Sequence, residues 1–307
     1  FIIDVDEGKW SKKIIETLLI DRTTNRNIIW GTDDYEILGR EYDSHYPILY
    51  SLITGKNSNV IQPRILKTKE SQGKRTKGKA EVFTPSWVCN AQNNLVDNAW
   101  FGSENIFNRE IEKGWETNTE KIKFPDKKNK TWQKYVDEKR LEITCGEAPY
   151  LVSRYDTVSG EPLELKDRIG MLDRKMRVVC ENTDSDTEWL KWSERAFQSV
   201  YGFEFQGDSL LIARENLLAS YCDYMEEKLN RHPTEKELVN IAKIISWNLW
   251  QMDGLTYTIP YEEAVEPFKQ VALFDLHEKE KKCLCIIKDW RAKRIYTFQD
   301  LVNKGGN

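Results

Sequence analysis

This chain has few histidines, and its cysteines are not clustered. Its 307 residues include only three histidines, His45, His232 and His277, which lie far apart in the sequence. The six cysteines are scattered except for the pair Cys283 and Cys285, so neither a disulfide framework nor a Cys-x-x-Cys zinc spacing is indicated. We therefore expect reduced thiols, no metal centre and no histidine-based catalytic triad.

Long apolar runs are also absent. No stretch of about 18 consecutive apolar residues occurs, which argues against a transmembrane helix. The first residues, FIIDVDEGKW, lack the basic flank and apolar stretch of a signal peptide. With 39% hydrophobic residues the chain has enough apolar side chains for a substantial core. We expect a globular cytoplasmic protein.

An overall positive charge is lacking as well. The net charge of −4 differs from that of an autonomous DNA-binding protein. Locally the balance is reversed, because residues 64–79 contain seven basic residues and one glutamate. Such a run indicates a mobile segment that contacts DNA phosphates, although a solvated surface loop is an equally good interpretation. The basic residues are Arg64, Lys67, Lys69, Lys74, Arg75, Lys77 and Lys79.

The first half of the sequence predicts helices separated by polar segments. Apolar residues recur at helical spacing over 10–19, and a strand-like run follows at 27–30. A second helix is predicted after Thr84-Pro85-Ser86, and a third around 132–139 beyond a polar, lysine-rich insertion. We expect residues 1–79 to form a mainly helical accessory region that includes the basic segment.

From residue 140 onward, short apolar runs alternate with helical patterns. Strands are predicted at 141–144, 200–205 and 247–252, with a late candidate at 283–287. The helices between them are predicted at 189–197, after 205, and from Thr234, where Glu237 completes a capping box. This alternation predicts a doubly wound α/β domain over 80–307, with insertions near 102–139 and 153–186.

Acidic residues stand at or near the ends of the three predicted strands. Glu142, Glu204 and Asp253 are expected to meet at one crevice, because ligands bind at the carboxyl ends of parallel strands. Together with a tight turn at Gly146 they suit a nucleoside-containing cofactor. Taken singly, the glycine is compatible with an ordinary turn and the carboxylates with a solvated surface.

Four segments resemble motifs of DNA adenine methyltransferases, in that family's order. LEITCGEAPYL (141–151) resembles the cofactor-binding motif, and AEVFTPSWVCN (80–90) resembles its companion, an aromatic-Thr-Pro turn that begins a helix. YGFEF (201–205), followed by ARENLL (213–218), is similar to the ribose-binding strand and the next helix, and WQMDGL (250–255) to the adenine-binding strand end. The resemblance implies a Rossmann-like, S-adenosylmethionine-dependent methyltransferase fold with an incomplete sheet.

The resemblance also implies a role for each matching residue. The methionine end of S-adenosylmethionine would contact Phe83, Thr84 and Pro85, and its centre Glu142, Thr144, Cys145 and Gly146. Glu204 would accept the ribose hydroxyls, Phe205 would pack on the adenine ring, and Asp253 would accept the adenine amine. The chain departs from the motif where Ile143 and Thr144 replace Pro-Ala and where Ala148 replaces a second glycine.

The motif that holds the target adenine in this family, Asn-Pro-Pro-Tyr, is missing. No two of the nine prolines are adjacent, and the nearest imitation, Ile259-Pro-Tyr261, lacks the acceptor asparagine. An extruded adenine must be stacked and its amine protons accepted, so we expect no catalytic residue in this chain. The resemblance then implies a split adenine-N6 DNA methyltransferase of a restriction-modification or phage-defence system. This chain would bind S-adenosylmethionine, and a second subunit would carry Asn-Pro-Pro-Tyr and read double-stranded DNA.

Two other interpretations stay open at this point. The chain could be a non-catalytic cofactor- or DNA-binding module in a restriction or antiphage complex, since its cofactor motif is altered. A complete methyltransferase for a small molecule would not need Asn-Pro-Pro-Tyr, but the basic run over 64–79 argues against it.

Overall fold

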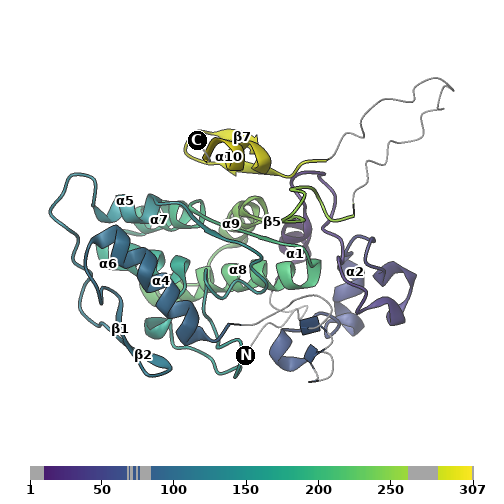
Figure 1. The fold of residues 1–307 in the computed structure, drawn as a ribbon, viewed down its shortest axis with the longest axis horizontal. Coiled ribbons are helices and arrows are strands. Elements are labelled where there is room, and N and C mark those ends of the chain that lie inside the picture. The colour runs from purple at the N-terminus through teal and green to yellow at the C-terminus, as the bar shows by residue number, and fades with distance from the viewer. Residues whose placement is uncertain are drawn as a thin grey trace.

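A parallel three-stranded sheet forms the centre of the molecule. The structure is a computed structural model, and it describes residues 10–67, 69, 72–73, 75–76, 84–261 and 283–305 (Figure 1). The strands are β3 (Arg140–Glu142), β4 (Val200–Glu204) and β5 (Leu249–Gln251), in the order β3-β4-β5. Both pairs are parallel, which confirms the predicted mixture of helix and parallel sheet. The first strand ends at Glu142, two residues earlier than predicted.

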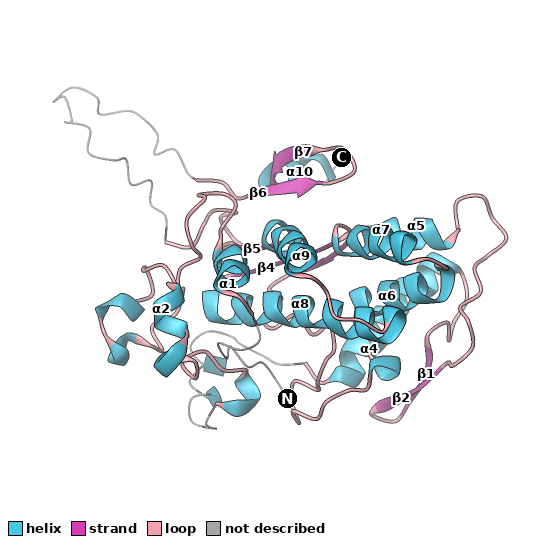
Figure 2. Ribbon diagram, turned by 180° about the vertical axis from the view of Figure 1, so that it is seen from behind, coloured by secondary structure: helices cyan, strands magenta, loops and turns pink. Residues whose placement is uncertain are grey.

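Pairs of helices connect these strands. Helices α6 (Met171–Asn182) and α7 (Asp186–Phe197) lie between β3 and β4, and α8 (Gly207–Leu229) and α9 (Glu235–Asn248) lie between β4 and β5. Two further helices, α4 (Ser86–Phe101) and α5 (Trp132–Asp137), precede the sheet. In Figure 2, β4 and β5 lie among α1 (Lys12–Leu19), α8 and α9, and both strands contact α8 and α9. The helices predicted in these regions are confirmed.

Helix α6 corrects one prediction. We expected a charged insertion over 153–186, but the second part of this segment is a helix with one buried apolar face. Leu172, Met176 and Val179 recur at helical spacing on that face and are fully buried. Two cationic residues of the helix, Arg174 and Lys175, are also buried. Their charges hid the helical pattern in the sequence.

The capping box predicted at Thr234 is present. Its hydroxyl accepts a hydrogen bond from the Glu237 N–H (3.3 Å), and the Glu237 carboxylate accepts one from the Thr234 N–H (2.7 Å). These bonds satisfy two of the backbone donors at the start of α9 that have no partner within the helix. They fix where α9 begins, and therefore where it delivers the chain to β5.

The N-terminal region shares the main core rather than forming a separate one. Trp10, Leu18 and Trp30 belong to the same cluster of buried residues as the side chains of α8 and α9. The chain passes so close to the start of α8 that a Cβ atom at Gly207 would lie 1.9 Å from the carbonyl oxygen of Ile29. The strand predicted at 27–30 is not formed. Asn27 and Ile29 instead make isolated β-bridges, to Ile20 and Pro47 respectively.

Short elements complete this region and the first insertion. They are α2 (Tyr50–Ile53), the 3₁₀ helices Glu36–Leu38, Arg40–Tyr42, Gly55–Asn57 and Arg64–Leu66, and the antiparallel strands β1 (Asn108–Ile111) and β2 (Gly114–Thr117). A further 3₁₀ helix, Leu165–Asp167, lies between β3 and α6. The β1–β2 hairpin and α2 lie at opposite ends of the long axis in Figure 1.

A small C-terminal unit covers the second face of the sheet. It comprises β6 (Ile286–Asp289), β7 (Arg294–Thr297) and α10 (Phe298–Gly305), coloured yellow in Figure 1. The predicted strand at 283–287 therefore overlaps β6, which pairs antiparallel with β7 and not with the parallel sheet. Phe298 packs on Phe203 and Trp250, with ring centroids 5.8 and 5.5 Å apart. Both faces of the sheet are thus covered by apolar side chains.

In the described part of the chain, no helix is both long enough and apolar enough to cross a membrane.

Candidate functional site

A large cavity opens at the carboxyl ends of β3 and β4. Its volume is about 1160 Å³, and its wall includes both strand ends, the loop after β3 and part of α4. Its lining residues come from distant parts of the sequence and are Gly31, Thr84, Gln92, Asn93, Val96, Lys139–Glu147, Pro149, Tyr150, Met171, Glu204, Phe205, Gln206, Ser209 and Tyr261. This is the crevice in which ligands of open α/β sheets bind.

The loop after β3 folds tightly against the end of β4. The Cys145 N–H donates to the Phe203 carbonyl (2.8 Å), and three nearby residues, Thr144, Gly146 and Ala148, have φ values of +46°, +52° and +63°. Left-handed φ values are routine for glycine but cost energy at threonine and alanine. Apart from its two chain neighbours, no described residue has an atom within 4 Å of the position that a Cβ would take at Gly146. A side chain there would project into open space, so the glycine leaves its backbone accessible from the cavity.

Glu204, at the end of β4, is anchored by three backbone donors. Its Oε2 accepts a hydrogen bond from the Gly146 N–H (2.8 Å), and its Oε1 accepts from the N–H groups of Phe205 (2.9 Å) and Gln206 (3.1 Å). The side chain is only 8% exposed. Burial raises its pKa above the ordinary glutamate value, while the three N–H donors oppose that shift. The result is a fixed carboxylate that joins the ends of two neighbouring strands.

Glu142, at the end of β3, is a second buried carboxylate in the same wall. It accepts hydrogen bonds from the N–H groups of Leu151 (3.2 Å) and Tyr150 (3.4 Å). Burial raises its pKa well above the usual value, and the negative charge of Glu204 adds to the shift. Two acidic groups therefore line one wall, and ionising both is costly unless a ligand donates hydrogen bonds to them.

An aromatic pair lies beside the carboxylates. The Phe205 and Tyr261 rings meet edge to face with centroids 5.3 Å apart, and the His45 ring also packs on Tyr261, with centroids 4.2 Å apart. Both Phe205 and Tyr261 line the cavity. They give the cavity an apolar surface suited to a planar ring.

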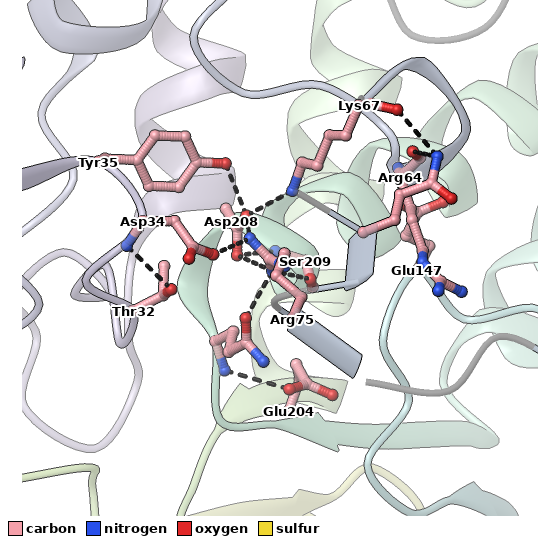
Figure 3. A network of polar contacts seen from close by, with 12 residues as sticks. Thr32, Asp34, Tyr35, Arg64, Lys67, Arg75, Glu147, Glu204, Asp208 and Ser209 are labelled. Carbon is pink, nitrogen blue, oxygen red and sulfur yellow. Dashed lines mark hydrogen bonds and ion pairs between the residues drawn. The ribbon is translucent and has the colours of Figure 1, made fainter. Parts of the chain in front are cut away.

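A buried ionic network supports the turn between β4 and α8. Asp208 receives bonds from the Arg75 guanidinium (2.8 and 3.1 Å), the Lys67 ammonium (3.0 Å) and the Tyr35 hydroxyl (2.7 Å), as Figure 3 shows. Arg75 also binds Asp34 (2.8 Å). Burial alone would raise the pKa of Asp208, but the charges of Lys67 and Arg75 outweigh it and hold that pKa well below the ordinary value.

The same arginine contacts the cavity wall. Arg75 donates to the side-chain oxygen of Gln206 and to the Ser209 hydroxyl (3.3 Å), and both of these residues line the cavity. Gln206 in turn donates its N–H to Glu204. Figure 3 shows Glu204 next to this network. Through Arg75, the basic segment therefore stabilises the turn between β4 and α8, which forms part of the cavity wall.

Most residues predicted to bind the cofactor are brought together. Thr84, Glu142, Thr144, Cys145, Gly146, Glu204 and Phe205 all line the cavity. Pro85 and Asp253 are outside the lining, and Phe83 lies outside the described residues. The Asp253 carboxylate accepts hydrogen bonds from the N–H groups of Leu255 (2.8 Å) and Thr256 (3.3 Å), so it stabilises the turn that follows β5.

The predicted DNA-binding residues fall into different environments. Arg75 is 1% exposed and Lys67 is nearly buried, because both neutralise Asp208. This arrangement turns their charges inward, away from a phosphate backbone, which the basic count alone did not indicate. Arg64 is half-buried and Lys69 is exposed. The remaining three, Lys74, Lys77 and Lys79, lie outside the described residues.

Several lining residues escaped the sequence analysis. Gln206 and Ser209 follow the second strand directly, so their place at its carboxyl end was a usable signal. Gly31 and Asn93 carried no such signal, because long-range packing brings them to the cavity. Tyr261 was noted only as part of a poor imitation of a catalytic motif.

Neither a metal-binding group of side chains nor a comparison with known proteins identifies a further functional site. Within the described ranges, no three His, Cys, Asp or Glu side chains are grouped so that they could hold a metal ion. The chain matches no protein-family model, no curated protein and no solved structure.

Proposed function

We propose that this chain binds S-adenosylmethionine in the cavity at the ends of β3 and β4, within a Rossmann-like methyltransferase fold. The observation that carries the proposal is the position of Glu204, a fixed carboxylate at the end of β4 that is bonded to the Gly146 turn after β3. A nucleoside cofactor requires an acidic group at this strand end for its ribose hydroxyls, and a close backbone approach at the preceding turn.

The available hydrogen-bonding positions support a ribose at Glu204. Each carboxylate oxygen has two lone pairs, and Oε1 already accepts two N–H groups. Among the described residues Oε2 accepts only the Gly146 N–H, which leaves a position for a hydroxyl donor. The Phe205 and Tyr261 rings would contact the adenine, and Thr84 lies in the wall where the methionine end is expected. The cavity volume of about 1160 Å³ is slightly above the roughly 300–1,000 Å³ typical of small-molecule sites, so a nucleoside cofactor would fit in it.

We further propose that the complete enzyme is an adenine-N6 DNA methyltransferase of a restriction-modification or phage-defence system. S-adenosylmethionine supplies an electrophilic methyl group when it is bound. The residues of this chain hold and orient it, but the chain has no Asn-Pro-Pro-Tyr to accept the amine protons of a target adenine. The proposal therefore includes a second subunit that carries this motif and reads double-stranded DNA. Of the basic residues that were predicted to contact DNA phosphates, Lys69 is exposed in the part of the chain that the structure describes.

Calorimetric titration of the purified chain with S-adenosylmethionine tests the binding step. We expect saturable binding that Glu204→Gln weakens by about tenfold or more, since hydrogen bonds to a charged group contribute about 1.5–3 kcal/mol. Phe205→Ala should also weaken binding, through loss of the aromatic surface. Glu227→Gln, which makes the same charge change on an exposed part of α8, should leave affinity unchanged.

Circular dichroism of each variant separates lost binding from lost folding. A folded Glu204→Gln variant with wild-type affinity would contradict the proposed site. Absence of binding by the wild-type chain and by its complex with the second subunit would contradict the proposed cofactor.

A non-catalytic ligand-binding subunit is the second candidate. The observation that favours it is the loop after β3, in which Thr144 and Ala148 take left-handed conformations that cost energy. A loop of this kind is compatible with retention of the ligand site without turnover. The two candidates differ in one measurement, because only the first predicts methyl transfer to adenine by the reconstituted complex.

A further inference from the structure

Another cavity lies at the opposite ends of the same two strands. Its volume is about 690 Å³, and it is lined by α5, by α7, which lies beside α5 in Figure 1, and by the turn between β6 and β7. Two lining residues, Asp137 and Gln198, stand just ahead of β3 and β4, so we call it the amino-end cavity. Among the described residues, none lines both this cavity and the one at the carboxyl ends. The proposed cofactor site therefore does not account for it.

Two guanidinium groups meet at one carboxylate in the amino-end cavity. Arg195 of α7 donates from its Nε to Asp137 at the end of α5, and Arg291 of the β6–β7 turn lies 2.5 Å from the other oxygen of Asp137. Among the described residues, neither arginine pairs with a second carboxylate. One carboxylate can neutralise only one of the two cations, so a positive charge is left uncompensated. An anionic group bound at the two guanidiniums would compensate it.

The rest of the wall adds to the positive charge. Lys134 and Lys191 are exposed there, and neither forms an ion pair with a described carboxylate. Glu194, the second carboxylate of the wall, accepts hydrogen bonds from the amides of Gln198 (2.8 Å) and Asn240 (3.0 Å). The described lining therefore contains four cations and two carboxylates, an excess of two positive charges.

The turn that carries Arg291 is held in place by its own contacts. Asp289 accepts hydrogen bonds from the N–H groups of Arg291 and Ala292 (both 2.9 Å), and its carboxylate pairs with Lys139 (2.7 Å). The charge of Asp289 is thus taken by Lys139 and not by the Arg291 guanidinium. Because the turn is fixed in advance, binding of an anion at Arg291 costs less conformational entropy.

An aromatic ring lies in the same wall. Trp192 is half-buried and lines the cavity, and Trp132 packs edge to face against it with ring centroids 4.7 Å apart. Trp132 therefore fixes the orientation of the Trp192 ring, while the part that lines the cavity is open to a planar group. Nucleic acid bases stack on such rings, because every base has a π face. The wall combines cations for a phosphate with an aromatic surface for a base.

We infer that the amino-end cavity binds a nucleoside phosphate, with the phosphate at Arg195 and Arg291 and the base on Trp192. Both guanidiniums keep donors for this purpose. Among the described contacts, Arg195 uses its Nε and Nη1, the latter for Gln198 (3.2 Å), and Arg291 uses its Nη1. The remaining nitrogens can form the short, charge-assisted bonds that phosphate oxygens accept. The volume of about 690 Å³ is within the roughly 300–1,000 Å³ typical of small-molecule sites.

A free nucleotide and a nucleotide within a single strand of nucleic acid share this chemistry. Calorimetric titration of the purified chain with guanosine monophosphate, and separately with a single-stranded thymidine oligonucleotide, distinguishes them. We expect saturable binding of at least one, which Arg291→Gln and Trp192→Leu each weaken by about tenfold or more. Binding of the mononucleotide identifies a free nucleotide as the ligand, and binding of the oligonucleotide alone identifies a strand.

Arg109→Gln is the matched control. Arg109 and Arg291 are both exposed and both paired with one carboxylate, since the Arg109 side chain is 64% exposed and 2.6 Å from Glu116, and the Arg291 side chain is 61% exposed. The control should leave nucleotide binding unchanged, because Arg109 lies on β1 and outside the amino-end cavity. Circular dichroism of each variant separates lost binding from lost folding.

Three results would overturn the inference. The first is the absence of binding of either ligand at about 1 mM. The second is wild-type affinity in folded Arg291→Gln and Trp192→Leu variants. The third is binding of inorganic phosphate as tight as that of guanosine monophosphate, which would show that the base makes no contact. Arg291→Gln should leave S-adenosylmethionine binding unchanged, so this inference and the proposed function can fail separately.

Discussion

Ala148 occupies a backbone conformation that normally belongs to glycine. Its φ of +63° lies in the left-handed region, and its side chain is fully buried. For an alanine this conformation costs about 1–2 kcal/mol. The loop after β3 keeps it because Ala148 donates its N–H to Cys145 and accepts the N–H groups of Leu151 and Val152. The loop therefore stores strain beside the cavity.

Ala148→Gly should leave the stability of the protein nearly unchanged. Relief of the left-handed conformation offsets the loss of a buried methyl group, which contributes about 0.8 kcal/mol. Ala196→Gly is the control, because Ala196 is also buried but lies inside α7, where glycine costs about 1 kcal/mol in addition to the lost methyl. Urea denaturation measures both. Equal destabilisation by the two substitutions would show that Ala148 is not strained.

Glu142 makes the stability of the protein depend on pH. Its pKa in the folded protein is raised above 4.5, the ordinary glutamate value, so the folded state holds its proton more tightly than the unfolded state. The stabilisation from this group is complete below about pH 4.5 and is lost as the pH rises through the folded-state pKa.

We therefore expect Glu142→Gln to gain stability relative to wild type as the pH rises. The gain is at most about 1.4 kcal/mol for each pH unit within that window. Unfolding free energies from about pH 5 to about pH 8 test this expectation. Glu227→Gln, at an exposed site, should show a constant difference from wild type. A constant difference for Glu142→Gln as well would mean that its pKa is not raised.

At the scale of elements, the basic segment is a structural support for the turn between β4 and α8. Arg75 connects Asp34 of the N-terminal region with Asp208 at the start of α8 and with Gln206 in the cavity wall. One guanidinium thereby joins the basic segment to two parts of the chain that are distant in sequence, the region around Asp34 and the β4–α8 turn. The geometry of this turn depends on that contact.

Arg75→Ala should destabilise the protein by about 3–5 kcal/mol, because it leaves Asp208 buried with too few partners. Lys69→Ala removes an exposed charge from the same segment and should change stability by about 0.5 kcal/mol or less. Denaturant unfolding compares the two. Restoration of part of the lost stability by Asp208→Asn in the Arg75→Ala background would identify the unpaired carboxylate as the cause; absence of any such restoration would argue against it.

At the scale of the whole molecule, the C-terminal unit and the parallel sheet share one apolar cluster. Phe203 and Trp250 of the sheet contact Phe298, and the Tyr201 hydroxyl donates to the Lys288 carbonyl (3.0 Å). These contacts predict that the unit and the sheet unfold together.

Phe298→Ala should cost about 2–3 kcal/mol, below the usual range for a fully buried phenylalanine because this ring is partly exposed. Ile295→Ala, at an exposed position of the same unit, should change stability by about 0.5 kcal/mol or less. Far-ultraviolet circular dichroism and tryptophan fluorescence should give coincident transitions in wild type. Separate transitions would show that the unit folds independently.

The sequence alone determined where several helices and strands form. The periodicity of 10–19 predicted α1, the Thr234 and Glu237 pair predicted the start of α9, and the apolar run at 200–205 predicted β4. These features depend on neighbours within a few residues, so local propensity is sufficient to specify them. The meeting of Glu204 and Gly146 was also predictable from the sequence, but for a different reason: the carboxyl ends of neighbouring parallel strands lie at a common edge.

Only the tertiary structure decided how charges and remote segments are used. Arg75 belongs to a run that reads as solvated, yet it is buried because Asp208 and Asp34 are brought to it by chain segments far away in sequence. Asp253 ends a strand like Glu204 but stabilises its own turn, and Gly31 and Tyr261 reach the cavity through long-range packing. A pattern of residue types records polarity and spacing. It does not record which remote group will compensate a buried charge, and that compensation determines where each of these side chains lies.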